Sequence, residues 1–446
     1  MNIYRRNLLL GGSAGLLLAP GLASFVQKDK GIELPEARSG GDSLWYELSG
    51  QKRVLPSLGN NISADVGIVG GGYTGLVAAI YLKKRRPDWR VVLLESHHLG
   101  AGASSRNSGA VYAKFTGLND HAIAERGLRR FMAFLEEESV DCDLQPANTL
   151  FLYSSESAAR EAQRELKDDE RWLDREELQQ SIASDFYSGA KASAGFYKIQ
   201  PVRLMQAYCR IALSLGVEIY ENSPVLSIES GEWNTLTSRK ASVQAKQVLL
   251  ATNAYTPRLG VADDKMFPVH QYSCSTGMLS REQIEALGLN NWDLRFEPNT
   301  LPITFGLSAS GHFFLRLVLG YASHDSSEWQ DLEYARALTR RVFAERYPQI
   351  GELGIAHEWH GVTAHTLNSR SIVSNVLSDR IYLCCAYNGL GIMPSHYSAY
   401  LSALKMTGEE VEDWRNLSRL NQHVSFLGDY YRSLMLKSSF NVLNAF

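Results

Sequence analysis

The sequence has few cysteines and nearly balanced charges. Five cysteines occur among 446 residues, and none forms a Cys-x-x-Cys pair. An odd number without that spacing predicts neither a zinc site nor a disulfide framework. Lysine and arginine total 45 against 48 acidic residues, so the formal net charge is −3. This balance provides no general electrostatic field for DNA or RNA, and we expect no nucleic-acid partner.

Long hydrophobic runs are also rare. The sequence has a single one, close to its N-terminus. Arg5 and Arg6 precede an apolar run over residues 8–25, and a small-residue site, Gly21-Leu-Ala23, lies near its end. This pattern is typical of a secretory signal, and the paired arginines favour the twin-arginine route. A run of this length can also just span a bilayer, so an uncleaved anchor is the alternative. We expect an exported (periplasmic) protein, or one tethered to a membrane by residues 1–27.

The remaining composition is that of an ordinary folded protein. Hydrophobic residues make up 45% and charged residues 21% of the chain, which excludes a collagen-like, coiled-coil or mainly disordered protein. The length is about three times that of a usual domain. The chain is therefore long enough for two sizeable cores, and it shows no internal repeat.

A glycine-rich turn between a predicted strand and a predicted helix carries the strongest chemical signal. Gly70, Gly72 and Gly75 have the Gly-x-Gly-x-x-Gly spacing, after a short apolar strand and before a helical pattern. Such glycines permit a tight turn, close approach of the backbone to a pyrophosphate, and close helix–sheet packing. Glu95 ends the next predicted strand, 20 residues after Gly75. Its carboxylate can accept the two ribose hydroxyls and would repel a 2′-phosphate, which argues against NADP.

Three later segments favour FAD over NAD as the dinucleotide. Residues 100–109 offer small side chains, hydroxyls and Arg106 shortly after the acidic residue. Residues 251–254 follow a late strand, where a two-part flavin domain returns to its sheet. Residues 388–391 precede a helix, whose N-terminal dipole stabilises negative charge on a reduced flavin. The order of these segments along the chain predicts a flavin more strongly than any one of them.

Together the motifs resemble those of the D-amino-acid-oxidase-type FAD oxidoreductases, and within that family the γ-glutamylputrescine oxidases are most similar. The resemblance extends from about Leu44 to Glu410. It rests on Asp65-Val-Gly-Ile-Val-Gly-Gly-Gly-Tyr-Thr-Gly75, Gly102-Ala-Ser-Ser-Arg-Asn-Ser-Gly109, Val140-Asp-Cys-Asp143, Ile182-Ala-Ser-Asp185, Asn253-Ala-Tyr255, Tyr347-Pro-Gln349 and Trp359-x-Gly361.

The resemblance implies a bound FAD and the oxidation of a primary or secondary amine. It implies that a hydride passes from the carbon beside nitrogen to flavin N5 and that the imine then hydrolyses. Oxygen or another acceptor, such as a quinone, reoxidises the flavin. Carried over by motif, the residues implied to hold FAD are Gly70, Gly72, Tyr73, Thr74, Gly75, Glu95, Ser104, Arg106, Asn107, Val225, Gly389, Leu390 and Gly391.

Two positions depart from the pattern of the family. Leu390 stands where the family usually has a histidine between two glycines. Val318 stands where some relatives have a lysine above the flavin that activates oxygen. The second departure favours a quinone or a protein as electron acceptor over oxygen.

Candidates for the substrate pocket come from the segments expected to meet the flavin. Hydride transfer from an amine requires correct placement more than a dedicated base, so no catalytic residue is assigned. Arg316 can pair with a substrate carboxylate as a bidentate fork or form a structural ion pair. Tyr272 lies where the chain enters the substrate domain, and Tyr387 can form a wall of the pocket. Trp359 and Asn388 are expected near the flavin ring, where Trp359 is more typical of packing.

Three histidines, His357, His360 and His365, occur close together in the sequence. They alternate poorly for one face of a strand, and no acidic ligand accompanies them. We therefore predict ordinary histidines and no metal site.

The sequence thus predicts an α/β fold with a Rossmann-like FAD-binding domain and a discontinuous α+β substrate domain that contains an antiparallel sheet. The expected function is oxidation of the CH–NH bond of a small amine or amino acid. The alternatives are a membrane-linked dehydrogenase that passes electrons to a quinone, and a flavoprotein that matures or serves a partner protein. The expected segments are a signal or anchor (1–27), a linker (28–59), the FAD-binding domain (60–145, 198–260 and 352–411), the substrate domain (146–197 and 261–351) and a C-terminal tail (412–446).

Overall fold

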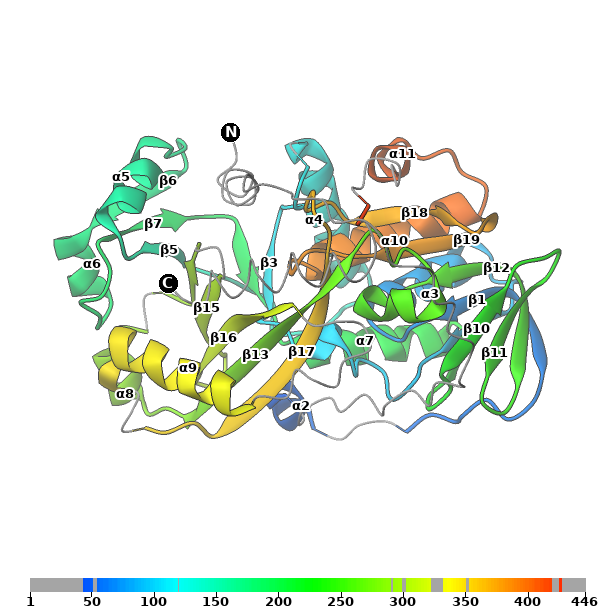
Figure 1. Ribbon diagram of the computed structural model, residues 1–446, viewed down its shortest axis with the longest axis horizontal. Helices are drawn as coiled ribbons and strands as arrows, with labels where there is room; N and C mark the ends of the chain where they lie inside the picture. Colours follow the sequence, from blue (N-terminus) through cyan, green and yellow to red (C-terminus); the bar gives the residue numbers. More distant parts are fainter. Residues whose placement is uncertain are drawn as a thin grey trace, which may run out of the picture.

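The computed structural model describes residues 43–50, 54–118, 120–289, 292–298, 302–321, 332–349, 353–418 and 425–426. The predicted signal or anchor segment and most of the predicted tail lie outside the described residues. Among the helices of the described part, none is long and apolar enough to cross a membrane. Figure 1 shows two sheets beside each other, each with helices packed against it.

The first sheet has eight strands and a parallel centre. Its strand order is β10-β11-β12-β1-β2-β9, and β19 pairs with both β12 and β18. The pairs β1–β2, β1–β12, β2–β9 and β12–β19 are parallel. This is the predicted Rossmann-like sheet. Its strands are β1 (Ile62–Val69), β2 (Val91–Leu94), β9 (Glu218–Tyr220), β10 (Val225–Glu229), β11 (Asn234–Ser238), β12 (Ser242–Leu250), β18 (Ile372–Val376) and β19 (Ser378–Cys385).

Helices cover the first sheet because its central strands are apolar on both faces, as parallel strands usually are. The residues of β2 and the second half of β1 are buried. Helix α3 follows the glycine turn and is buried over its first ten residues, and its basic last turn complements the helix dipole. The helices associated with this sheet are α2 (Leu44–Ser49), α3 (Tyr73–Arg85), α4 (His121–Glu137), α7 (Pro201–Ser214), α10 (Ile392–Met406) and α11 (Glu412–Leu417).

The second sheet also has eight strands, in the order β17-β13-β16-β15-β14-β5-β7-β6. Neighbouring strands are antiparallel except β14 and β5, which are parallel. Figure 1 shows α9, drawn in yellow, along the outer side of this sheet. The strands are β5 (Thr149–Tyr153), β6 (Glu170–Asp174), β7 (Gly189–Ser193), β13 (Phe267–Met278), β14 (Leu294–Glu297), β15 (Ile303–Leu307), β16 (His312–Tyr321) and β17 (His357–His365); the helices are α5 (Glu156–Arg164), α6 (Arg175–Ser181), α8 (Arg281–Ala286) and α9 (Leu332–Arg346).

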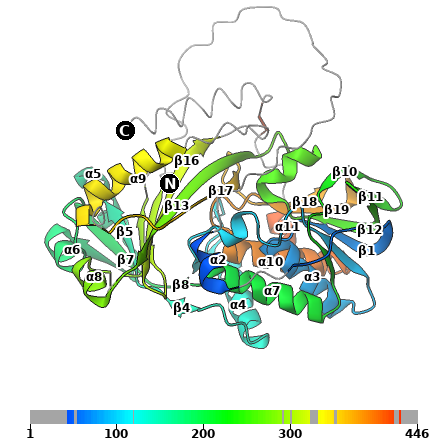
Figure 2. The ribbon, with the colours of Figure 1, turned by 90° about the horizontal axis from the view of Figure 1, so that it is seen from below.

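A small sheet of three strands lies where the chain passes between the two large sheets (Figure 2). Its order is β3-β8-β4, and both pairs are antiparallel. Two short 3₁₀ helices belong to the loops of the first sheet. These elements are β3 (Ala110–Tyr112), β4 (Gln145–Pro146), β8 (Phe196–Lys198), η1 (Ala103–Ser105) and η2 (Asn253–Leu259).

The structure differs from the predicted segments in two places. Strand β17 was expected in the FAD-binding domain, within 352–411, but it pairs with β13 along its whole length and is the edge of the second sheet. The predicted linker contains helix α2, whose first three residues, Leu44 to Tyr46, are buried. Both differences arise from contacts between residues that are far apart in the sequence.

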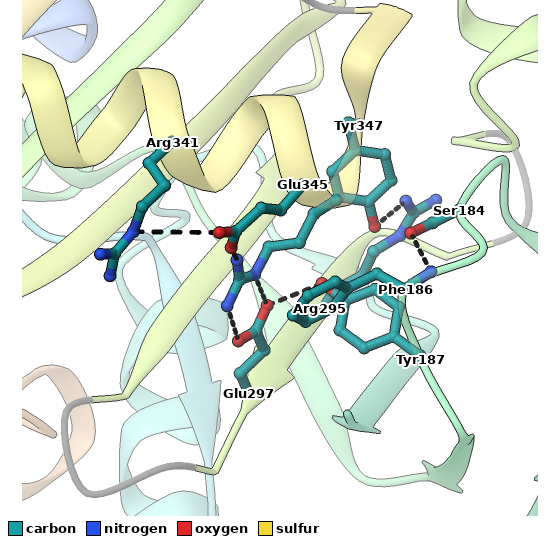
Figure 3. A network of polar contacts seen from close by, with 9 residues as sticks. Ser184, Phe186, Tyr187, Arg295, Glu297, Arg341, Glu345 and Tyr347 are labelled. Carbon is teal, nitrogen blue, oxygen red and sulfur yellow. Dashed lines mark hydrogen bonds and ion pairs between the residues drawn. The ribbon is translucent and has the colours of Figure 1, made fainter. Parts of the chain in front are cut away.

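A buried polar network joins α9 to the outer side of the second sheet (Figure 3). Glu297 is 1% exposed and accepts hydrogen bonds from Arg346 Nε at 2.6 Å and from the Tyr187 hydroxyl at 2.7 Å. Arg295 is fully buried and donates to the Tyr347 hydroxyl at 2.7 Å. Because charges this deep require partners, the network fixes the position of α9 on the sheet.

Candidate active site

The glycine turn between β1 and α3 brings several backbone segments close together. Gly70 has φ +110°, and a Cβ there would lie 2.6 Å from the carbonyl oxygen of Ala251. A Cβ on Gly75 would lie 2.0 Å from the carbonyl oxygen of Gly70. At Gly72 it would lie 2.8 Å from Ser104 Oγ. Side chains are therefore excluded here, and the N-terminus of α3 is left open to a phosphate.

The carboxylate of Glu95 lies beside this turn, at the end of β2. It accepts hydrogen bonds from the N–H of Gly71 at 2.7 Å, the N–H of His97 at 2.9 Å and the hydroxyl of Ser96 at 3.0 Å. Its two oxygens together offer about four lone-pair sites, so capacity remains for ribose hydroxyls. Val225 begins β10, two residues after Ser223, whose N–H donates to the Glu95 carbonyl at 2.8 Å.

Several side chains predicted to hold FAD make contacts within the protein. The Tyr73 hydroxyl donates to the carbonyl of Pro201 at 2.9 Å, and burial raises its pKa. Ser104 accepts from the N–H of Tyr73 at 3.0 Å, so it lies at the α3 N-terminus. Thr74 and Tyr387 share a hydrogen bond of 2.9 Å between their hydroxyls. The side chains of Tyr73 and Thr74 and the N–H of Tyr73 therefore all have partners within the protein.

The loop after Glu95 is shaped by its own polar side chains. Arg106 is 6% exposed and donates to the carbonyls of Ala101 at 3.0 Å and His360 at 2.9 Å. Asn107 donates to the carbonyl of Ser104 at 2.9 Å and accepts from the N–H of Gly109 at 2.9 Å. Both predicted residues therefore stabilise this loop, Asn107 through its own backbone and Arg106 also through β17 of the second sheet.

The C-terminal turn before α10 has an unusual backbone. Ala386, Asn388 and Gly389 all have φ between +53° and +80°. Asn388 stabilises this turn, because its side chain accepts from the N–H of Thr366 at 2.9 Å and donates to the carbonyl of Ala386 at 2.8 Å. Leu390 and Gly391 complete the turn, and Gly391 is the N-cap of α10.

Arg316 lies on the inner face of the second sheet, the face turned away from α9. Its guanidinium donates to Gln271 Oε1 and Thr304 Oγ1, each at 3.1 Å, and the residue is 8% exposed. Gln271 Nε2 in turn donates to Thr363 Oγ1 at 2.8 Å, and Thr363 lies 3.1 Å from His365 Nε2. We call these five residues, Arg316, Gln271, Thr304, Thr363 and His365, the inner-face cluster.

The inner-face cluster meets the FAD-binding loops at the junction of the two sheets. A Cβ on Gly389 would lie 3.7 Å from both Gln271 Nε2 and His365 Cε1. On β17, the edge strand that also carries His365, a Cβ on Gly361 would lie 3.2 Å from Arg106 Cδ. Burial and the nearby Arg316 lower the pKa of His365 to about 4. The imidazole is therefore neutral near pH 7 and adds no second positive charge beside Arg316.

A cavity of about 250 Å³ opens between the FAD-binding loop and the second sheet. Ser108 of the FAD-binding loop and Phe314, two residues before Arg316 on β16, both line it. Lys198 and Arg203 also line it, and each is paired with an aspartate. The cavity lining thus combines charged and polar side chains with the aromatic rings of Trp45 and Phe314.

Tyr272 does not belong to this site. Because side chains of a strand alternate, and Ser273 is the residue opposite Arg316, Tyr272 points to the other face of the sheet. It is 1% exposed, packs in the core under α9, and donates its hydroxyl to Glu358 at 2.8 Å. Tyr272 is therefore a core residue, and the prediction that it lines the substrate pocket is wrong.

Tyr387 and Trp359 have packing roles in the structure. Tyr387 is buried against Thr74 of α3. Trp359 is 2% exposed and donates its indole N–H to the carbonyl of Arg106 at 3.2 Å. The sequence analysis missed Gln271, because β13 carries several other polar residues, among them His270 and Ser273.

The side chains of His357, His360 and His365 do not point toward a common site. His357 lies 3.1 Å from the carboxylate of Glu47, His360 binds Arg106 through its carbonyl, and His365 belongs to the inner-face cluster. Within the described ranges, no three histidine, cysteine or acidic side chains are arranged to hold a metal ion. All five cysteines are free and buried.

The residues fit an FAD. The glycine turn excludes side chains where a pyrophosphate must approach, and a carboxylate lies beside it for the ribose. This architecture is that of an FAD-dependent oxidoreductase.

Comparison with known families specifies the class further. The chain belongs to the FAD dependent oxidoreductase family (DAO), whose model matches residues 65–404. The family predicted from the motifs is thus confirmed, and FAD is its cofactor. Two similar proteins are the probable oxidoreductase OrdL of Rhizobium meliloti (27% identical, covering 82% of this chain and 89% of the relative) and the gamma-glutamylputrescine oxidoreductase of Escherichia coli K12 (26%, covering 82% and 89%).

A solved structure confirms the predicted fold. Glycine oxidase from Geobacillus kaustophilus superposes with a TM-score of 0.69 at 21% identity, over 81% of this chain and 99% of that one. L-proline dehydrogenase from P. horikoshii gives 0.63 at 17% identity, over 82% and 100%. The mixed α/β architecture, with a parallel dinucleotide-binding sheet and a largely antiparallel second sheet, is therefore shared.

Proposed function

We propose that the protein oxidises the carbon–nitrogen bond of an amine that also carries a carboxylate, such as an amino acid. The observation that supports this is the buried Arg316 on the inner face of the second sheet, whose guanidinium donates to Gln271 and Thr304. A guanidinium binds a carboxylate through two parallel charge-assisted hydrogen bonds. The names of two relatives, glycine oxidase of Bacillus subtilis and gamma-glutamylputrescine oxidoreductase, denote compounds with both groups.

The bound FAD supplies the acceptor for the electron pair that leaves the substrate carbon. The protein's own residues bind and orient. Arg316 holds the carboxylate, and the chain of hydrogen bonds through Gln271 and Thr363 holds Arg316. The cavity beside Ser108 and Phe314 is the space that we propose for the rest of the substrate. Such positioning contributes much of the rate of a reaction that has no dedicated base.

We further propose that the electrons pass to a quinone or another acceptor in preference to oxygen. Val318 pairs with Gln271 and shares the face of Arg316. An apolar side chain at this position provides no positive charge to stabilise reduced oxygen. The predicted export signal or anchor at residues 1–27 is consistent with a protein that works beside a membrane, and we propose that location.

Anaerobic mixing of the purified flavoprotein with a set of compounds tests the proposal. The set contains amino acids, γ-glutamyl amines and amines without a carboxylate, and the loss of the yellow flavin colour is followed. We expect bleaching by a carboxylate-bearing amine, slow return of colour in air, and fast return with a quinone. Bleaching by plain amines alone would contradict the role of Arg316. Intact colour with every compound would favour a flavoprotein that serves a partner protein.

A further inference from the structure

Two tryptophans bind neighbouring carbonyl groups of the FAD-binding loop. The indole N–H of Trp359, on β17, donates to the carbonyl of Arg106 at 3.2 Å. The indole N–H of Trp45, on α2, donates to the carbonyl of Asn107 at 2.8 Å. The two rings contact each other edge to face, with centroids 6.4 Å apart. Two elements remote in sequence therefore hold consecutive peptide groups from the same side.

This arrangement determines where the N–H groups of the loop point. In a trans peptide, the N–H is directed opposite to the C=O of the same unit. The N–H groups of Asn107 and Ser108 therefore point away from the two indoles. Neither N–H has an acceptor among the residues that the structure describes. They are donors available to a ligand on the open side of the loop.

Helix α2 is itself fastened to the same loop. The Ser43 hydroxyl donates to the carbonyl of Ser105 at 2.6 Å, and the Tyr46 hydroxyl donates to the carbonyl of Leu99 at 2.8 Å. The carbonyl of Trp45 accepts from Gln200 Nε2 at 2.7 Å, and its ring packs against Phe314 of the second sheet at 5.4 Å. Short as it is, α2 connects the FAD-binding loop, helix α7 and the second sheet.

We propose that Trp45 is a positioning residue for FAD. Its indole N–H holds the Asn107 carbonyl outward and so presents the Ser108 N–H to the bound dinucleotide. Helix α2 precedes the glycine turn and lies outside the dinucleotide-binding motif, and it nevertheless contributes to cofactor binding. This inference concerns cofactor binding and does not depend on which substrate is oxidised.

The substitution Trp45→Phe tests the hydrogen bond, because phenylalanine keeps a ring between Phe314 and Trp359 but has no N–H. The matched control is Trp233→Phe, at a tryptophan that is 40% exposed on the β10–β11 hairpin. The dissociation constant for FAD is measured on the full-length apoprotein from the quenching of flavin fluorescence. We expect Trp45→Phe to raise it about three- to tenfold, the usual effect of one lost hydrogen bond, and Trp233→Phe to leave it unchanged.

Two further readouts separate positioning from simple loss of stability. The visible circular dichroism of the bound flavin should change in Trp45→Phe, while the urea midpoint of the apoprotein should stay close to that of the parent. Unchanged FAD affinity with an unchanged flavin spectrum would overturn the proposal. A weaker affinity that is matched by an equal loss of apoprotein stability would also overturn it, since Trp45 would then only support the fold.

Discussion

Replacing Arg316 by glutamine should selectively impair substrates that carry a carboxylate. Glutamine can still bond to Gln271 and Thr304, but it has no positive charge. The substitution therefore removes the charged partner of the substrate and leaves a polar group in a buried place. The variant should bind FAD with the affinity of the parent, because the inner-face cluster borders the cofactor site without forming the glycine turn.

The expected size of the effect follows from the burial of the guanidinium. Hydrogen bonds to charged groups contribute about 1.5–3 kcal/mol when the site excludes water, and Arg316 is 8% exposed. Such a loss corresponds to a decrease of about tenfold to 150-fold in kcat/KM. A substrate analogue without the carboxylate should lose little, because it does not use the missing charge.

The assay is anaerobic reduction of the flavin by the two compounds, compared in Arg316→Gln, in the parent and in a control. Arg336→Gln is the matched control, since Arg336 pairs with Glu358 on the outer face of the same sheet. The control should reduce both rates equally or not at all. Equal losses of rate for both compounds in Arg316→Gln would refute the assignment, because the arginine would then support the sheet and not the carboxylate.

Three more predictions follow from the structure. Glu95→Arg should weaken FAD binding at least tenfold, measured as flavin release, because it replaces the ribose acceptor by a cation; tight binding would show that the adenosine end lies elsewhere. Glu297→Ala should lower the free energy of unfolding by about 3–5 kcal/mol in urea titrations, because it removes the buried carboxylate of Arg346 and leaves this arginine with the more exposed Glu345, whereas an exposed pair would show almost no change. His365 has a pKa lowered from 6.5 to about 4 in the folded state. The unfolded chain therefore binds the extra proton between these values, so stability should fall as the pH is lowered through this window, and His365→Gln should flatten part of that slope.

The glycine turn and its acidic partner could be predicted because their signals are local. Gly70 to Gly75 and Glu95 belong to one βαβ unit, so their spacing in sequence determines their spacing in the fold. The same holds for the turn before α10, which precedes a strongly apolar helix. The role of a residue can therefore be predicted from the sequence when it depends only on segments that are adjacent along the chain.

The inner-face cluster could not be predicted in the same way. Strand β13 is buried on both faces along most of its length, so the alternation that would distinguish Gln271 from Tyr272 is absent. The face of each residue is determined by pairing with β16 and β17, which are distant in the chain. Helix α2 has too few residues to show a periodicity, and its contacts join residues 62 positions apart. An aromatic cluster in a polar segment was the one available signal.

The position of β17 has a consequence for the order in which the protein folds during synthesis. Strand β13 leaves the ribosome well before β17, and until then one of its edges has no partner in the second sheet. Unpaired edges pair readily with other chains, so nascent protein at this stage is prone to aggregate. The same late strand carries Trp359 and His365. The second sheet is therefore completed late in translation, before the turn at Gly389 and α10 that complete the flavin site, and chains truncated before residue 357 should accumulate as insoluble, colourless protein.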